Sequence, residues 1–309
     1  RPFRQLVARS ARLASLCALA GASAASSAMS APVSNALAAT GNNCAVCLYD
    51  GSDASSLAVD GNSSLTINGG SVTVDSSAAN AAVVGGNATV TSAGVNVVGS
   101  TRADGNGSFS PTPLTGVTAA ADPLGGLAVP SLSGSPQDVA VGGNDTQTIG
   151  PGVYGSIDDG GNASLTLGAG VYVITRGLTV SGNASLTGNN VALYFACSGY
   201  PTGCNGGQAG AGLQFNGNGQ FQITSPGGDV YQGVAIYYDR NNSAPLRLNG
   251  NGTVTGTIYA RSAGLLVDGN GAATLNSLVL VNTAHLASNG NVTVNISSGQ
   301  NSPQVLWPS

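Results

Sequence analysis

A Gly-Asn dipeptide followed by alternating hydroxyl and apolar residues recurs ten times along the chain. Six of the nine intervals between successive copies are 18 to 25 residues long, and the remaining three are 33 to 38 residues long. A repeat of about 20 residues indicates a solenoid, in which each unit buries its apolar face against its neighbours. The copies begin at Gly61, Gly86, Gly105, Gly143, Gly161, Gly182, Gly217, Gly250, Gly269 and Gly290.

Each interval divides into short strands. Between Gly161 and Ser181, three runs with a two-residue apolar period are separated by Gly-Ala-Gly and Arg-Gly, where glycine readily forms a corner. We therefore predict an all-β chain: a parallel, right-handed β-helix of roughly ten to twelve rungs, about 20 residues each, with lateral loops. The repeated asparagines are expected to stack as a hydrogen-bonded ladder.

The repeats predict four regions along the chain. Residues 1–31 are a signal peptide or the remnant of an N-terminal anchor, and residues 32–112 form N-terminal rungs. Residues 113–136, which contain Pro113, Pro123 and Pro130, are a Pro/Gly-rich linker or lateral loop. Residues 137–309 form the C-terminal rungs.

The first 31 residues also predict the compartment. A basic stretch with four arginines precedes a short apolar block and an Ala/Ser-rich segment, the order found in export signals. We expect an exported protein in the periplasm, on the cell surface or outside a bacterium, with membrane attachment left open.

Charge is scarce and negative. Charged residues make up 7% of the chain, Lys and Glu are absent, and beyond position 12 there are five Arg and thirteen Asp. A surface of this kind does not attract phosphate backbones, so nucleic acid is not an expected partner.

Four cysteines lie outside the N-terminal segment. Cys197 and Cys204 enclose a Pro- and Gly-containing loop and predict a local disulfide. Cys44 and Cys47 leave three alternatives: a structural disulfide, an unpaired or cross-linking pair, or a redox or metal site.

Several blocks carry a resemblance to a known family. They are CLYDGSDASSLAVDGNSSLTINGG, ADPLGGLAVPS, GAGVYVITRGLTVSGNASLTGNNVALYF, GVAIYYDRNN and GTIYA, in this order between Cys44 and Val305. This succession resembles the extracytoplasmic region of tight-adherence (Flp) pilus assembly proteins of the TadG/TadE-like type. The resemblance implies an envelope protein connected with pilus biogenesis or adhesion, with no catalytic residues.

Candidate chemistry is sparse. Asp158, Asp159, Asp229 and His285 lack the partners that acid-base catalysis requires, so we expect no enzyme, no cofactor and no metal site. One aromatic and polar cluster is a candidate binding patch for a glycan: Tyr237, Tyr238, Asp239, Arg240 and Arg247.

Three functions follow in order of preference. The first is a non-catalytic scaffold of the envelope or surface, associated with tight-adherence pilus assembly or adhesion, with other envelope or pilus proteins as partners. The second is an adhesin or glycan-binding β-helix. The third is a polysaccharide lyase or hydrolase.

Overall fold

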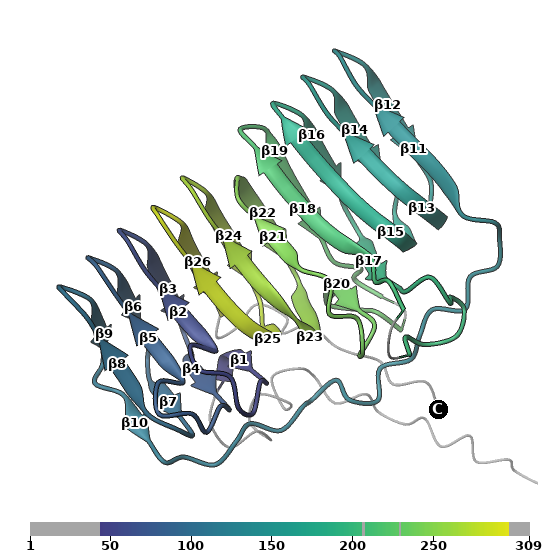
Figure 1. Cartoon of the computed structure of the whole chain (residues 1–309). Helices are drawn as coiled ribbons and strands as arrows, with labels where there is room; N and C mark the ends of the chain where they lie inside the picture. Colours follow the sequence, from purple (N-terminus) through teal and green to yellow (C-terminus); the bar gives the residue numbers. More distant parts are fainter. Residues whose placement is uncertain (1–43, 206–207, 229, 297–309) are drawn as a thin grey trace, which may run out of the picture.

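The computed structural model describes residues 44–205, 208–228 and 230–296, and these contain β-strands but no helix (Figure 1). Every ladder between named strands is parallel. The prediction of an all-β chain of parallel strands is therefore confirmed. The predicted signal peptide or anchor remnant, residues 1–31, lies outside the described residues, as do residues 32–43 and 297–309 of the predicted rungs.

The strands form two sheets. The ten-stranded sheet contains one strand after each Gly-Asn step. Its spatial order is β12 (Thr146–Ile149), β14 (Ser164–Leu167), β16 (Ser185–Gly188), β19 (Gln220–Thr224), β22 (Asn251–Thr255), β24 (Ala272–Asn276), β26 (Asn291–Asn295), β3 (Ser64–Asn68), β6 (Thr89–Thr91) and β9 (Ser108–Ser110).

The sixteen-stranded sheet has a main path and five strands beside it. The main path is β10 (Leu114–Thr115), β7 (Val95–Val97), β4 (Ser71–Val74), β1 (Cys44–Leu48), β25 (Val279–Leu286), β23 (Thr257–Val267), β20 (Val234–Tyr238), β17 (Val191–Phe195), β15 (Gly170–Gly182), β13 (Gly152–Asp159) and β11 (Gln137–Val141). The strands beside it are β2 (Leu57–Val59), β5 (Ala82–Val84), β8 (Thr101–Ala103), β18 (Gly212–Gly217) and β21 (Leu246–Leu248).

Long strands join the two parts of the larger sheet. The first part of β15 pairs with β17 and its second part with β18, while β23 pairs with β20 and β21 in the same way. Because β17 pairs with β20 and β18 with β21, these six strands form a closed ring of parallel pairings. Further strands extend the sheet on both sides of this ring.

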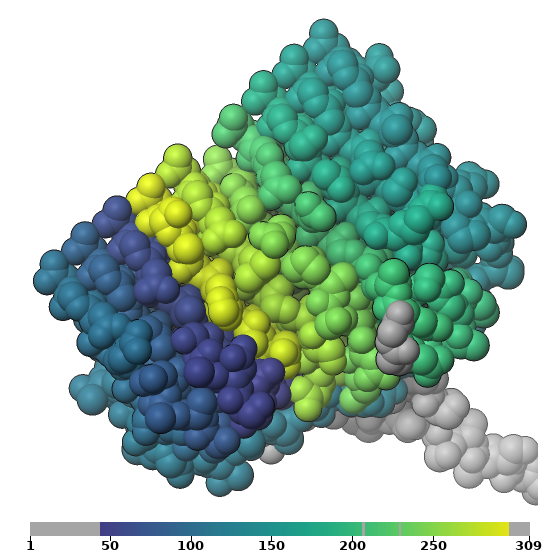
Figure 2. All heavy atoms as spheres, viewed as in Figure 1, coloured from purple at the N-terminus to yellow at the C-terminus, as the bar shows by residue number. Residues whose placement is uncertain are grey.

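The spatial order of the repeats differs from their order in the chain. The first described strands, β1, β2 and β3, lie in the middle of the stack, and the chain continues from them to one end at β9 and β10. It then crosses to the opposite end at β11 and returns, so that β25 pairs with β1 and β2, and β26 pairs with β3. We call this junction the seam; in Figure 2 the purple N-terminal repeat lies directly against the yellow C-terminal one.

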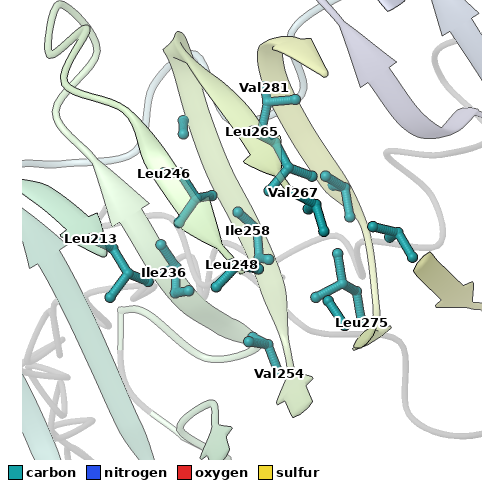
Figure 3. Close-up of a cluster of buried hydrophobic side chains, with 14 of the residues drawn as sticks. Leu213, Ile236, Leu246, Leu248, Val254, Ile258, Leu265, Val267, Leu275 and Val281 are labelled. Atoms are coloured by element: carbon teal, nitrogen blue, oxygen red, sulfur yellow. The ribbon is translucent and has the colours of Figure 1, made fainter. Parts of the chain in front are cut away.

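Aliphatic side chains from both sheets fill the interior. Leu165, Leu186 and Phe221 point inward from consecutive strands of the ten-stranded sheet and are fully buried. They belong to one continuous apolar core that extends across the seam. Figure 3 shows side chains of β20 to β25 meeting in this interior.

A second apolar layer covers the outer face of the larger sheet. Residues 116–136, which we call the strap, run along the stack from β10 to β11 (Figure 1). Leu124 and Leu127 of the strap pack with tyrosines of the sheet, such as Tyr194 and Tyr237. The strands VALYF and VAIYY are consequently buried on both faces, which explains why they lack polar alternation.

Candidate binding surface

Strand register places threonines in a straight row on the outer face of the ten-stranded sheet. The row, which we call the threonine column, consists of Thr148, Thr166, Thr187, Gln222, Thr253, Thr274, Thr293, Thr66, Thr91 and Ser110. Eight of these ten residues are threonines, and five consecutive ones run from β22 to β6 across the seam. Neighbouring members are about 4.8 Å apart, as adjacent strands of a sheet are.

A second row lies two residues earlier in each strand, about 7 Å from the first because of the strand rise. We call it the flanking column: Thr146, Ser164, Ser185, Gln220, Asn251, Ala272, Asn291, Ser64, Thr89 and Ser108. None of the ten strands contains a charged residue. The outer face is therefore a neutral wall of regularly spaced hydroxyl and amide groups.

Asparagines at the corner before this sheet hold the repeats in register. The side-chain amide of Asn62 donates to Asn289 at 3.1 Å across the seam, and Asn87 and Asn106 continue the row at 2.9 and 3.0 Å. Further bonds link Asn270 to Asn289 and join Asn144, Asn162 and Asn183. The predicted asparagine ladder is present in these two stretches, and every amide donates in the same direction along the stack.

The corner glycines allow the repeats to approach closely. Gly86 has φ of 66°, and a Cβ on it would lie 2.7 Å from the Gly61 carbonyl oxygen of the neighbouring repeat. A side chain there would be strained by the backbone angle and would also clash with that oxygen. The same positive φ occurs at the glycine of seven of the ten steps, and Ser288, with φ of 66°, takes this corner in the last repeat.

The ladder is interrupted near β19 and β22, where the surface is hollowed. Asn249 donates to Asn216 at 3.0 Å and not to the corner asparagine of the neighbouring repeat. A shallow hollow of about 450 Å³ lies here, lined on the wall by Gln220, Gln222, Thr253 and Thr274. A second one of about 340 Å³ lies at the adjoining corner, lined by asparagines and glycines. Neutral hydrogen-bonding groups therefore line both hollows.

The five residues predicted as a glycan patch lie elsewhere. Tyr237 and Tyr238 are 3% and 0% exposed, and their hydroxyls are used internally. The Tyr237 hydroxyl donates to Leu127 O of the strap at 2.9 Å, and the Tyr238 hydroxyl accepts from Leu213 N at 2.8 Å. Neither ring presents a face on which a sugar could stack.

The three charged members of that group also make internal contacts. Asp239 is buried and accepts from the Tyr194 hydroxyl at 2.6 Å and from Cys204 N at 3.1 Å. Arg240 binds the strap through Asp122 and the backbone carbonyls of Leu124 and Gly125. Arg247 is half-exposed and lies 3.7 Å from Asp268.

Asp122 is the main attachment point of the strap. Its Oδ2 accepts from the Tyr259 hydroxyl at 2.9 Å and lies 3.3 Å from both Arg240 and Arg261. Burial and the neighbouring carboxylate of Asp122 raise the pKa of Tyr259, so its hydroxyl remains protonated and donates. This role of Asp122 was not predicted from the sequence, although VAIYY and GTIYA form an unusual concentration of aromatic residues.

The candidate catalytic residues are dispersed. Asp158 is exposed, whereas Asp159 faces the core, is 1% exposed and has no hydrogen-bond partner for either carboxylate oxygen. His285 lies in β25 between Ala58 and Leu266, and Asp229 lies outside the described residues. Across the described part of the chain, no three His, Cys, Asp or Glu side chains form a group that could hold a metal ion.

Both cysteine pairs form disulfides. Cys197–Cys204 closes the loop that follows β17, as predicted, and its position is fixed by the bond from Cys204 N to Asp239. Cys44–Cys47 lies within β1, and this pair also forms a disulfide. Each bridge joins residues close in sequence, so neither links the two ends of the stack.

Comparisons with known proteins give no relative: no family model, curated protein or solved structure matches the chain.

Proposed function

We propose that the protein is a non-catalytic scaffold of the bacterial cell envelope or surface, associated with tight-adherence pilus assembly or adhesion. We further propose that its fold is a right-handed parallel β-helix with about ten rungs, one for each strand of the ten-stranded sheet. Such a rod would present its outer wall to other envelope or pilus proteins.

The observation that carries this proposal is the continuity of the parallel ladders. Ten strands pair without a gap from β12 to β9, including the seam, and the strap joins the two ends on the opposite sheet. Tyrosine and arginine side chains of the protein's second group of repeats, β11 to β26, bind the strap through Asp122 and the Leu127 carbonyl oxygen. These contacts suit a rigid body whose function depends on shape and surface.

One further observation supports an exported location. The two disulfides fit an oxidising compartment, where such bonds persist. Among the described residues, the structure contains no helix long and apolar enough to cross a bilayer.

Deletion of the gene in its native host tests the role in pili or adhesion. We expect fewer surface pili or weaker attachment, restored by the wild-type gene, and neighbouring genes for a pilin, a secretion ATPase and a prepilin peptidase. Normal piliation and attachment in the deletion strain, without such neighbours, would contradict the proposal.

The hollow on the wall favours glycan binding as a second candidate function. It offers the amides of Gln220 and Gln222 beside the hydroxyls of Thr253 and Thr274, which are suitable partners for sugar hydroxyls. Binding on a glycan array that is lost in Gln222→Ala and kept in Arg247→Ala would support this site. The reverse result would favour the loop near Arg247.

A further inference from the structure

The neutral wall has a periodicity that sets it apart from the rest of the surface. From β22 to β6, the threonine column contains Thr253, Thr274, Thr293, Thr66 and Thr91 without interruption. The chain order alone would place these residues in two separate groups, because Thr66 and Thr293 become neighbours only at the seam. A single array of this length is therefore a product of the topology.

Each threonine contributes a hydroxyl and a methyl group in a nearly fixed orientation. Branching at Cβ restricts χ1, and the strand holds the backbone, so little side-chain freedom remains to be lost on binding. The threonine hydroxyls repeat at about 4.8 Å along the column, and the side chains of the two columns are about 7 Å apart. These two spacings are close to the two unit-cell repeats of hexagonal ice. In these five strands the flanking column supplies a hydroxyl at Ser64 and Thr89 and an amide at Asn251 and Asn291.

Side-chain hydrogen bonds also hold the residues at the edges of the array in place. Beyond the threonine column, Asn68 donates to Asn295 at 2.9 Å, and Asn295 donates to Asn276 at 2.9 Å. Within the flanking column, the Ser64 hydroxyl donates to Asn291 at 2.6 Å. Hydrogen bonds along the stack therefore keep the spacing of neighbouring side chains regular.

The chemistry of the wall favours an ordered water lattice over a polymer or a charged partner. A charged side chain would hold its own hydration shell and disturb a lattice, and none occurs in the ten strands. The aromatic residues of these strands, Phe109 and Phe221, alternate with the outward columns, so the wall offers no ring for stacking against sugar. The hydroxyl groups can hydrogen-bond to water molecules. The methyl groups between them make no hydrogen bonds, so the water molecules above them bond to one another.

We propose that the threonine and flanking columns form an ice-binding surface, with the lattice of water molecules at an ice face as the ligand. This inference does not rest on a role in pilus assembly, because it concerns a property of the isolated chain. Its centre is the pair Thr293 and Thr66 at the seam, and the hollow beside Gln222, which Thr253 and Thr274 also line, lies at one end of the array.

Single-crystal osmometry of the purified protein tests the proposal. We expect a gap between the melting and the growth temperature of ice, faceted crystals, and incorporation of the protein into a slowly growing ice front. Thr66→Lys should abolish all three, because its longer charged side chain would stand above the array. Thr66→Val, which keeps the methyl group and loses the hydroxyl, should reduce the gap by less.

Thr179→Lys is the matched control. Thr179 lies on β15 of the other sheet, beside Asp158 and Gln214, and points away from the core. This variant should keep the full effect, and circular dichroism should show that both lysine variants remain folded. Exclusion of the wild-type protein from ice, or equal activity in Thr66→Lys and wild type, would overturn the proposal. Retention on microcrystalline cellulose or chitin without ice activity would overturn it in favour of a polysaccharide ligand.

Discussion

Asp159 is a carboxylate in an apolar environment, which destabilises its charged form. Its side chain points into the core at the end of β13, where its backbone pairs with Val141 and Val180. Burial raises the pKa of Asp159 to about 6, above the ordinary value for an aspartate. Burial also raises the pKa of Asp75 to about 6, although Ala120 N of the strap donates to it at 2.8 Å.

The raised pKa values predict how stability changes with pH. Between about pH 4 and pH 6 the folded state binds more protons than the unfolded state, so stability increases as pH falls through 6 and is lower at pH 7. Asp159→Val should raise the free energy of unfolding at pH 7 by about 2 kcal/mol and flatten this dependence. Urea denaturation at pH 5 and pH 7 measures both effects.

The neighbouring carboxylate provides the control for that prediction. Asp158 is exposed, so Asp158→Asn should leave the pH dependence of unfolding unchanged. A destabilised Asp159→Val variant at pH 7 would show that the carboxylate has a partner that stabilises its charged form.

At the scale of single elements, the strap depends on Asp122. Its side chain is 14% exposed and faces two arginines and the Tyr259 hydroxyl. Asp122→Asn leaves those cations without a counter-charge, and we expect a loss of about 2 to 3 kcal/mol. Limited proteolysis should then cleave the strap faster, with the first cut between residues 116 and 136.

Asp104→Asn is the corresponding control on the surface. Asp104 pairs with Arg102 at 2.7 Å, but both side chains are 53% exposed. An exposed pair contributes about 0 to 1 kcal/mol, so this variant should resemble wild type in both assays. Equal losses in the two variants would mean that Asp122 does not hold the strap.

The sequence predicts elements better than it predicts their neighbours. Gly-Asn steps locate the strands of the ten-stranded sheet because the corner needs a residue such as Gly86 with positive φ. The seam is not encoded locally, since β3 offers the same pattern to β26 as it does to β6. The threonine column was visible only as alternating hydroxyls, because its straightness depends on the register between repeats.

The same limit explains why two tyrosines of the predicted glycan patch are buried in the structure. Tyr237 and Tyr238 precede a polar loop, and their position in the chain gives no sign that the strap covers Tyr237 or that Tyr238 points into the core. The apolar run VAIYY indicates this burial, because it lacks the alternation of polar and apolar residues that is typical of a strand with one solvent-exposed face. A strand buried on both faces requires a second layer, and residues 116–136 supply it.

At the scale of the whole molecule, the seam and the strap make one body from two groups of repeats. The first group comprises β1 to β10 and the second comprises β11 to β26, and the strap is their covalent connection. Ladders between β25 and both β1 and β2, together with β26 and β3, join the groups without that connection. Strap residues before position 133 also bind the second group through Asp122, Leu127 and Pro130.

This arrangement predicts that a cut strap leaves the molecule assembled. A protease site inserted after the exposed Gly134 should be cleaved in the folded protein, and the two fragments should still elute together in size-exclusion chromatography. The cleaved protein should unfold at lower urea than the intact one, and its midpoint should depend on protein concentration, because unfolding now separates two chains. Cleavage combined with Asp122→Asn should lower the midpoint further, since the strap then contributes less to holding the fragments together. Separation of the fragments in buffer alone would show that the parallel ladders at the seam are too weak to join the two groups.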